Sequence, residues 1–144
     1  MTPTPDVIAA AQAAQKATRV PASVSIAQYG LESGWGQHMP PGTNNPFGIK
    51  AFYGNDVMSQ TTEVINGKVV HEEQPFAVYD NIADAFIAHA NLIATSPVYA
   101  NAMNQLPNLP MFVAIMAHHY ATDPQYAPKI MEIIRDGNLT QYDI

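Results

Sequence analysis

The stretch GLESGWGQ at residues 30–37 decides the fold, and a second stretch, NNPFGIKA, follows it at residues 44–51. Residues 21–31 are predicted to form a helix that leads into the first stretch. Pro21 suits the first turn of a helix, where its missing N–H costs nothing. Gly34 then marks the end of the helix, because glycine readily adopts the left-handed conformation of a C-cap.

One face of this helix is predicted to be apolar, since Val24, Ala27 and Leu31 recur at three- and four-residue spacing. Glu32 therefore falls in the last turn, where the negative end of the helix dipole and partial loss of water both disfavour a carboxylate. Its pKa should rise, which suits an acid that donates a proton near neutral pH. From position alone, the more common alternative to an acid with a raised pKa is that Glu32 is an exposed last-turn residue and that Trp35 is a core residue.

A β-hairpin is predicted at residues 60–73, because an Asn-Gly pair between β-branched runs is a strong signal for a type I′ turn. This turn puts Glu63 and Glu72 on one face as diagonal neighbours. A solvated acidic surface is the usual outcome for such a pair. The implied register pairs Ile65 with Lys68, Val64 with Val69, Glu63 with Val70 and Thr61 with Glu72.

Helices are also expected from residue 4 or 6 to residue 18, at 82–95 and at 111–120. In the second of these, His89 lies on the apolar stripe and is interpreted as a hydrogen-bonded core histidine.

The last helix is expected to start with Asp123 as its cap and Pro124 in its first position. Pro128 would then lie inside the helix, where it should produce a kink.

The composition restricts the class of partner. Residues 1–144 are expected to form a single domain, and a net charge of −6 argues against a nucleic-acid partner. There is no cysteine, so neither disulfides nor thiolate chemistry are expected. The first residues have no basic segment followed by an apolar run, so no signal peptide is predicted, and no stretch approaches transmembrane length.

Neither a metal nor another cofactor is predicted. His118 and His119 are adjacent and would point about 100° apart on a helix, unlike the i, i+4 pair that binds zinc. The sequence has no phosphate-binding glycine loop and no Gly-x-Ser-x-Gly elbow, and Ser33 has no evident base as a partner.

The runs ESGWG at 32–36, NNPFGIKA at 44–51 and YATDPQYA at 120–127 closely resemble the bacterial glucosaminidase domain, glycoside hydrolase family 73. That family includes the hydrolase domain of the flagellar rod protein, many autolysins and phage lysins. The resemblance extends from about residue 20 to residue 134 and departs from the family pattern at Pro46. It implies a mainly α, lysozyme-like fold with one β-hairpin lobe over a substrate cleft.

The resemblance also implies roles for individual residues. Glu32 matches the general acid that acts on a peptidoglycan glycosidic bond. Glu63, in the run TTE at 61–63, matches the usual candidate for the second carboxylate, with Glu72 as its local rival. The expected substrate-binding residues are Trp35, Asn45, Phe47, Tyr120 and Tyr126, of which Tyr120 is preferred over Tyr126.

The expected reaction is hydrolysis of the β-1,4 bond after N-acetylglucosamine in peptidoglycan glycan strands. Alternatives are a muramidase or lytic transglycosylase on the same scaffold, and an inactive glycan-binding module. The expected setting is a phage lysin or a secreted antibacterial effector that reaches the wall by lysis, export or injection. An effector would have a cognate immunity protein. Neither nucleic-acid binding nor membrane insertion is expected.

Overall fold

The computed structural model describes residues 2–51, 56–65 and 68–144, and within 56–74 it describes the backbone alone. The elements are α1 (Pro5–Thr18), α2 (Ala22–Ser33), β1 (Asp56–Ile65), β2 (Lys68–Ala77), α3 (Ile82–Thr95), the 3₁₀ turn η1 (Pro97–Tyr99), α4 (Ala100–Asn104), α5 (Leu109–Tyr120), α6 (Tyr126–Asp136) and the 3₁₀ turn η2 (Leu139–Tyr142). The expected fold class is confirmed: helices with a single antiparallel hairpin among the described residues.

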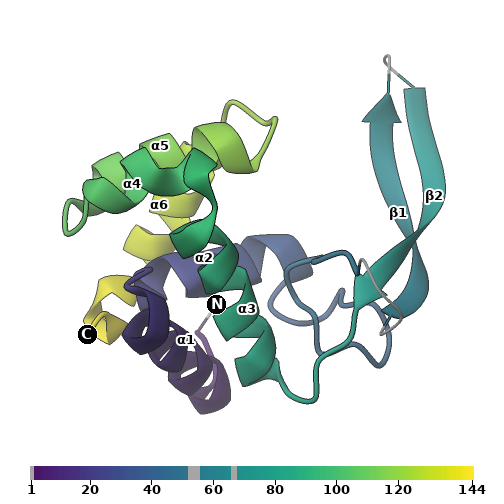
Figure 1. The fold of residues 1–144 in the computed structure, drawn as a ribbon, viewed down its shortest axis with the longest axis horizontal. Coiled ribbons are helices and arrows are strands. Elements are labelled where there is room, and N and C mark those ends of the chain that lie inside the picture. Colours follow the sequence, from purple (N-terminus) through teal and green to yellow (C-terminus); the bar gives the residue numbers. More distant parts are fainter. Residues whose placement is uncertain (1, 52–55, 66–67) are drawn as a thin grey trace.

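Helix α2 runs through the middle of the helical body and ends on the side that faces the hairpin (Figure 1). It packs against α1, α6 and η2. Every residue from 22 to 30 is buried, whereas Leu31 is 37% exposed. Val24 and Ala27 of the predicted apolar face are buried, but the other sides of the helix are buried as well, which the pattern did not predict. Its many alanine, serine and glycine residues let neighbours approach from all sides, which is typical of a central helix.

Helices α1 and α3 pack against each other in the lower part of the helical body in Figure 1, away from α4 and α5. Helix α1 begins at the earlier of its two predicted starts, with Thr4 as its cap, whose hydroxyl accepts from the Val7 N–H at 3.3 Å. Its alanines Ala10, Ala11 and Ala14 are buried. Helix α3 has Asn81 as its cap, bonded to the Asp84 N–H at 2.8 Å.

The hairpin has the predicted register, with Glu63 opposite Val70 and Thr61 opposite Glu72. The turn at 66–67 lies outside the described residues, as do the side chains of Glu63 and Glu72. The root of the hairpin is joined to the loop that follows α2: the Ala51 N–H donates to the Pro75 carbonyl at 2.9 Å, and the Ala77 N–H to that of Ile49 at 2.8 Å. The two strands project from this root beside the helices (Figure 1).

The start of the last helix differs from the prediction. Helix α6 begins at Tyr126, and Asp123 lies before it, where its carboxylate accepts from the Gln125 N–H at 2.8 Å and pairs with Lys129 at 2.6 Å. Pro128 is consequently the third helical residue rather than an interior one. The first N–H groups of a helix have no acceptor within it, so proline is tolerated there and no kink is required.

Within the described part of the chain, no helix combines the length and the apolar character needed to cross a membrane.

Candidate active site

Glu32 lies at the end of α2, and the turn that follows it is fixed by local hydrogen bonds. Gly34 caps the helix with a φ of 56° and Trp35 has a φ of 59°, both in the left-handed region. The Ser33 hydroxyl donates to the Tyr29 carbonyl at 2.6 Å and accepts from the Gly36 N–H at 2.9 Å. Ser33 is thus occupied in shaping the turn.

A groove of about 600 Å³ opens at this end of α2. The segment between α5 and α6 forms one side of it, and Phe47 comes from the loop that carries the hairpin. Its lining residues are Leu31, Glu32, Phe47, Tyr120, Ala121, Thr122, Asp123, Tyr126 and Lys129.

The Glu32 carboxylate is held in the groove by Tyr126, whose hydroxyl donates to Oε1 at 2.9 Å. Although the residue as a whole is exposed, its carboxyl end is partly buried, and this burial raises its pKa above the usual value. The hydrogen bond from Tyr126 has the opposite and smaller effect, because it favours the charged form. The net direction suits a group that must carry a proton.

Tyr126 is buried and connects Glu32 to the core. Its hydroxyl accepts from Gln28 Nε2 at 3.2 Å, and its ring stacks on Tyr120 with the centroids 5.4 Å apart. Burial first, and then the negative charge of Glu32, raise the pKa of Tyr126 well above its usual range. Its hydroxyl therefore remains protonated and serves as a hydrogen-bond donor.

His89 supports the opposite side of the tyrosine pair. Its Nε2 lies 3.1 Å from the Tyr120 hydroxyl, and its ring stacks on Phe47 with the centroids 4.0 Å apart. Burial lowers its pKa to about 3, so it is neutral near physiological pH. These contacts agree with the interpretation of His89 as a hydrogen-bonded core residue.

The glucosaminidase family model, described as mannosyl-glycoprotein endo-beta-N-acetylglucosaminidase, matches residues 8–139 of this chain. The chain belongs to the glucosaminidase family. This membership confirms the resemblance found in the sequence and places the chain among the glycoside hydrolases.

Curated glucosaminidase relatives come from several bacteria. The chain is 37% identical over 131 residues to the peptidoglycan hydrolase FlgJ of Vibrio cholerae, covering 83% of this chain and 39% of that protein. It is 36% identical over 143 residues to an autolysin of Enterococcus faecalis, covering 92% of this chain and 19% of that protein. The chain therefore spans less than half the length of these relatives.

Solved structures of the glucosaminidase type share the fold. The catalytic domain of the autolysin Auto from Listeria monocytogenes is 29% identical, with a TM-score of 0.82. The match covers 96% of this chain and 84% of that one. A C-terminally truncated glycoside hydrolase domain of FlgJ from Salmonella typhimurium is 30% identical, with a TM-score of 0.72. The match covers 91% of this chain and 95% of that one.

Of the seven residues expected in the glucosaminidase site, the structure brings Glu32, Phe47, Tyr120 and Tyr126 to one groove. The preference for Tyr120 over Tyr126 as a substrate contact stays a prediction, since both line the groove and Tyr126 is the more buried of the two. Tyr126 bonds Glu32 directly, and Tyr120 stacks on the Tyr126 ring. The side chain of Glu63 is not described, so its role stays a prediction.

Asn45 is positioned to hold the loop together, not to contact a sugar. It is fully buried, its Nδ2 donates to the carbonyls of Ile49 at 2.7 Å and Ala77 at 3.1 Å, and its Oδ1 accepts from the Ile49 N–H at 3.1 Å. Both amide protons are therefore in use, and we correct the expectation of a polar substrate contact.

Of the two other expected stacking walls, Phe47 is a core residue and Trp35 is half-buried. Phe47 is 6% exposed, and one face of its ring stacks on His89. Phe86 packs edge-on against Phe47, with the ring centroids 4.9 Å apart. Phe47 forms the base of the groove rather than an open platform. Trp35 is half-buried, lies against Gly30 and packs edge-on against Tyr29, and it is not among the residues that line the groove.

Gln28 was missed as a site residue. It lies four residues before Glu32 on the same face of α2, and it is a large polar side chain in a helix of small and apolar ones. That contrast was the available signal.

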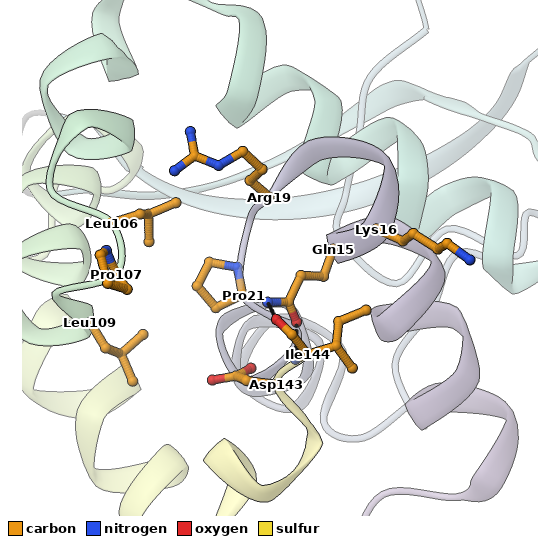
Figure 2. A pocket seen from close by; sticks show the side chains of 9 residues that line it. All are labelled: Gln15, Lys16, Arg19, Pro21, Leu106, Pro107, Leu109, Asp143 and Ile144. Carbon is orange, nitrogen blue, oxygen red and sulfur yellow. Dashed lines mark hydrogen bonds between the residues drawn. The ribbon is translucent and has the colours of Figure 1, made fainter.

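A slightly larger cavity of about 680 Å³ lies at the other end of α2 (Figure 2). Its one carboxylate side chain, Asp143, accepts from the N–H of Ser23 at 2.7 Å and from its hydroxyl at 2.8 Å, while Gln15 bonds the backbone of Ile144. These groups connect the last described residues to α1 and α2. We therefore assign the site to the groove at Glu32, where the acid is.

Among the described residues, no group of three or more histidine, aspartate or glutamate side chains could hold a metal ion.

Proposed function

We propose that this chain hydrolyses glycosidic bonds in peptidoglycan glycan strands, with Glu32 as the general acid, and that it cuts the β-1,4 bond after N-acetylglucosamine. The observation that carries the proposal is the partly buried Glu32 carboxyl, held by the Tyr126 hydroxyl at 2.9 Å in an open groove. A glycosidic oxygen leaves only if it is protonated, and a carboxyl with a raised pKa can supply that proton.

The shape of the surface supports an elongated substrate. The groove at Glu32 and a neighbouring hollow of about 630 Å³ share the segment from Tyr120 to Asp123. A substrate of several sugar units could contact both hollows across this shared segment. The names of the relatives, peptidoglycan hydrolase and autolysin, support peptidoglycan as that substrate.

The second group in the mechanism is proposed to be Glu63, with Glu72 as its rival. Its carboxylate would activate water on the opposite face of the sugar, or the acetamido group of the substrate would attack first. Carboxyl groups about 6.5–9.5 Å apart suit direct inversion, and a separation of about 5–5.5 Å suits a covalent nucleophile.

A second candidate function, cleavage after N-acetylmuramic acid, is favoured by one observation. A Lactococcus lactis relative, 37% identical over 130 residues, is named a probable N-acetylmuramidase. The two activities differ in the sugar that carries the new reducing end, so product analysis separates them.

The test is digestion of purified sacculi by the wild type, Glu32→Gln, Glu63→Gln and Glu72→Gln. Glu132→Gln is the matched control, since Glu132 is an exposed glutamate on α6. Loss of a general acid commonly lowers the rate by about 10²–10⁴-fold, so we expect that loss for Glu32→Gln and wild-type release for the control. A Glu32→Gln enzyme that releases fragments at the wild-type rate would refute the proposal.

For the biological setting, we propose a phage lysin or an injected antibacterial effector. An effector would have an immunity protein that covers the groove around Glu32. Co-expression with the products of neighbouring genes would reveal such an inhibitor, and its loss of inhibition on groove variants would locate it. If no neighbouring product inhibits the enzyme, the lysin setting is favoured.

A further inference from the structure

Gln28 is a buried amide placed directly behind the tyrosine that holds Glu32. It is fully buried in α2, one helical turn before Glu32. Its Nε2 donates to the Tyr126 hydroxyl at 3.2 Å and lies 3.7 Å from the Met116 sulfur. Three side chains thus form a chain of hydrogen bonds, from Gln28 to Tyr126 to Glu32 Oε1.

The direction of this chain is fixed by the number of protons. The Tyr126 hydroxyl has one proton, and its oxygen already accepts an N–H from Gln28. Its own proton is therefore directed to Glu32 Oε1, 2.9 Å away. With the Gln28 amide reversed, a carbonyl oxygen would face the hydroxyl, and that single proton would have to serve either Gln28 or Glu32.

The packing of Gln28 alone does not explain an amide at this position. Its carbonyl oxygen is buried and has no hydrogen-bond partner among the described residues. An apolar side chain of similar volume would fill the space without leaving a polar atom unpaired. The bond to Tyr126 is what the amide adds.

We propose that Gln28 is a positioning residue for the general acid, because its amide obliges the Tyr126 hydroxyl to donate to Glu32 Oε1 and so leaves Oε2 to carry the acid proton. This inference rests on the proposed function. In the reaction, the proton on Oε2 passes to the leaving glycosidic oxygen as the glycosidic bond breaks. The carboxylate that remains on Glu32 is then stabilised by the Tyr126 hydroxyl.

Without Gln28, the Tyr126 oxygen becomes available as an acceptor. A protonated Glu32 could then donate its proton to Tyr126, which is a direction that does not serve the substrate. The hydroxyl would also be a weaker donor, because a hydrogen bond received by an oxygen strengthens the bond that it gives.

Few other titratable side chains surround Glu32 in the described part of the chain. Tyr126 and Lys129 face the groove from α6, Tyr120 from α5, and Asp123 from the segment between them. Lys129 is paired with Asp123 at 2.6 Å. Of these groups, Tyr126 is the one that has a hydrogen bond with Gln28 in the described part of the chain.

The direct test is a titration of the Glu32 carboxyl by ¹³C NMR in the wild type, Gln28→Met, Tyr126→Phe and the double variant. We expect both single variants to raise the pKa of Glu32, since each weakens a bond that favours the carboxylate. In the Tyr126→Phe background, Gln28→Met should add no further shift, because Gln28 acts only through the hydroxyl. Met116→Leu, which removes the sulfur that lies 3.7 Å from Gln28 Nε2, should leave the pKa of Glu32 unchanged.

The kinetic readout separates positioning from binding. We expect Gln28→Met to lower kcat about tenfold, the effect that one hydrogen bond commonly represents, with KM retained. The alkaline limb of the pH–rate profile should move to higher pH. If Gln28→Met leaves kcat and the alkaline limb of the pH–rate profile unchanged, the inference is overturned. A Glu32 pKa shift that Gln28→Met still causes in the Tyr126→Phe background would overturn it as well.

Folding is expected to be preserved. Replacing an incompletely bonded amide by methionine should leave the melting temperature equal or higher, whereas a purely structural amide would lower it. If Gln28→Met does not fold, the side-chain amide resonance of Gln28 is followed in the wild type. It should titrate with Glu32 and lose that titration in Tyr126→Phe, and an amide signal indifferent to Glu32 would overturn the inference. Glu32→Gln with full activity would instead reject the proposed function itself.

Discussion

Glu32 combines a raised carboxyl pKa with a hydrogen bond that favours the charged form. Because its pKa in the folded state lies above the ordinary value of 4.5, the protonated form favours folding at acid pH. That contribution is fully present below the unfolded-state pKa and is lost as the pH rises through the folded-state pKa. A functional requirement therefore opposes stability near neutral pH.

Glu32→Gln should accordingly be more stable than the wild type at pH 7. Glutamine keeps an oxygen for Tyr126 but has no charge to desolvate. Thermal unfolding across pH would measure the difference, which should disappear below about pH 4.5, where the wild-type carboxyl is protonated in both states. If Glu32→Gln is more stable than the wild type by the same amount at pH 4 and at pH 7, this explanation is contradicted.

The buried amide of Asn45 should be among the more important polar groups of the loop. Asn45→Ala removes the acceptor of the Ile49 N–H and the donor to the Ile49 and Ala77 carbonyls, and the Ile49 carbonyl keeps only the Ala77 N–H among these bonds. We expect a loss of about 3 kcal/mol in the free energy of unfolding, from the usual cost of unpaired buried groups. Urea denaturation measures it.

Asn44→Gly is the matched control for that experiment. Asn44 is exposed and has a φ of 49°, which glycine adopts without strain. Its side chain donates to the carbonyls of Tyr79 at 3.0 Å and Asp80 at 3.3 Å near the surface, so its loss should matter less. Equal losses at both positions would show that burial of Asn45 is not the reason.

At the level of single residues, the sequence was sufficient to place Glu32 in the last turn of its helix, but not to place the residues around it. The position of Glu32 follows from the spacing of helix residues and the glycine that ends the helix. The roles of Asn45 and Phe47 depend on partners from the hairpin root and from α3, which no local pattern specifies. Gln28 and Tyr126 meet across 98 positions of sequence.

Among the secondary-structure elements, α2 depends on small residues for its close packing. A Cβ built on Gly30 would lie 2.6 Å from the Trp35 ring. In a helix, glycine to alanine is normally favourable by about 1 kcal/mol. Here the indole must move for the alanine to fit.

We expect Gly30→Ala to destabilise the protein by about 1–3 kcal/mol, as overpacking of a core commonly does. Urea unfolding gives the value. The double variant Gly30→Ala with Trp35→Leu should be less destabilised than the sum of the two single variants, because the obstructing ring is absent. Strict additivity would contradict a clash between these two positions.

The boundaries of elements were predictable where a cap is local. Thr4 and Asn81 begin α1 and α3 through their own side chains, and the Asn-Gly pair gave the strand register. The start of α6 was misplaced because Asp123 uses its carboxylate for Gln125 and Lys129. The burial of α2 on all sides was not predicted, because a helix of small residues can be packed on every side and its sequence does not show this.

For the whole molecule, His89 connects α3, α5 and the loop at Phe47. Its pKa is about 3 in the folded protein and near 6.5 when unfolded. The stability that it allows is present above pH 6.5 and is lost as the pH falls toward the folded-state value, because only the unfolded chain binds the proton.

The wild type should therefore lose about 2 kcal/mol of stability from this residue between pH 7 and pH 5. His89→Gln, which can still bond the Tyr120 hydroxyl but does not titrate, should show a flatter profile over this range. Denaturant unfolding at a series of pH values would compare the slopes. Parallel profiles for the two proteins would mean that His89 does not govern the acid sensitivity.

The overall architecture was foreseeable from the resemblance, and the helix patterns and hairpin register agree with it. The groove was not foreseeable in the same way. It forms where the end of α2 meets the loop at Phe47 and the segment between α5 and α6, so its lining depends on three-dimensional packing.

The central claim is that this chain cuts peptidoglycan after N-acetylglucosamine, with Glu32 as the general acid. The most direct measurement digests purified sacculi with the wild type and Glu32→Gln, reduces the products with borohydride and identifies the reduced sugar by mass spectrometry. We expect reduced N-acetylglucosamine ends from the wild type alone. Reduced muramic acid ends or anhydro ends would contradict the bond assigned, and equal products from Glu32→Gln would contradict the role of Glu32.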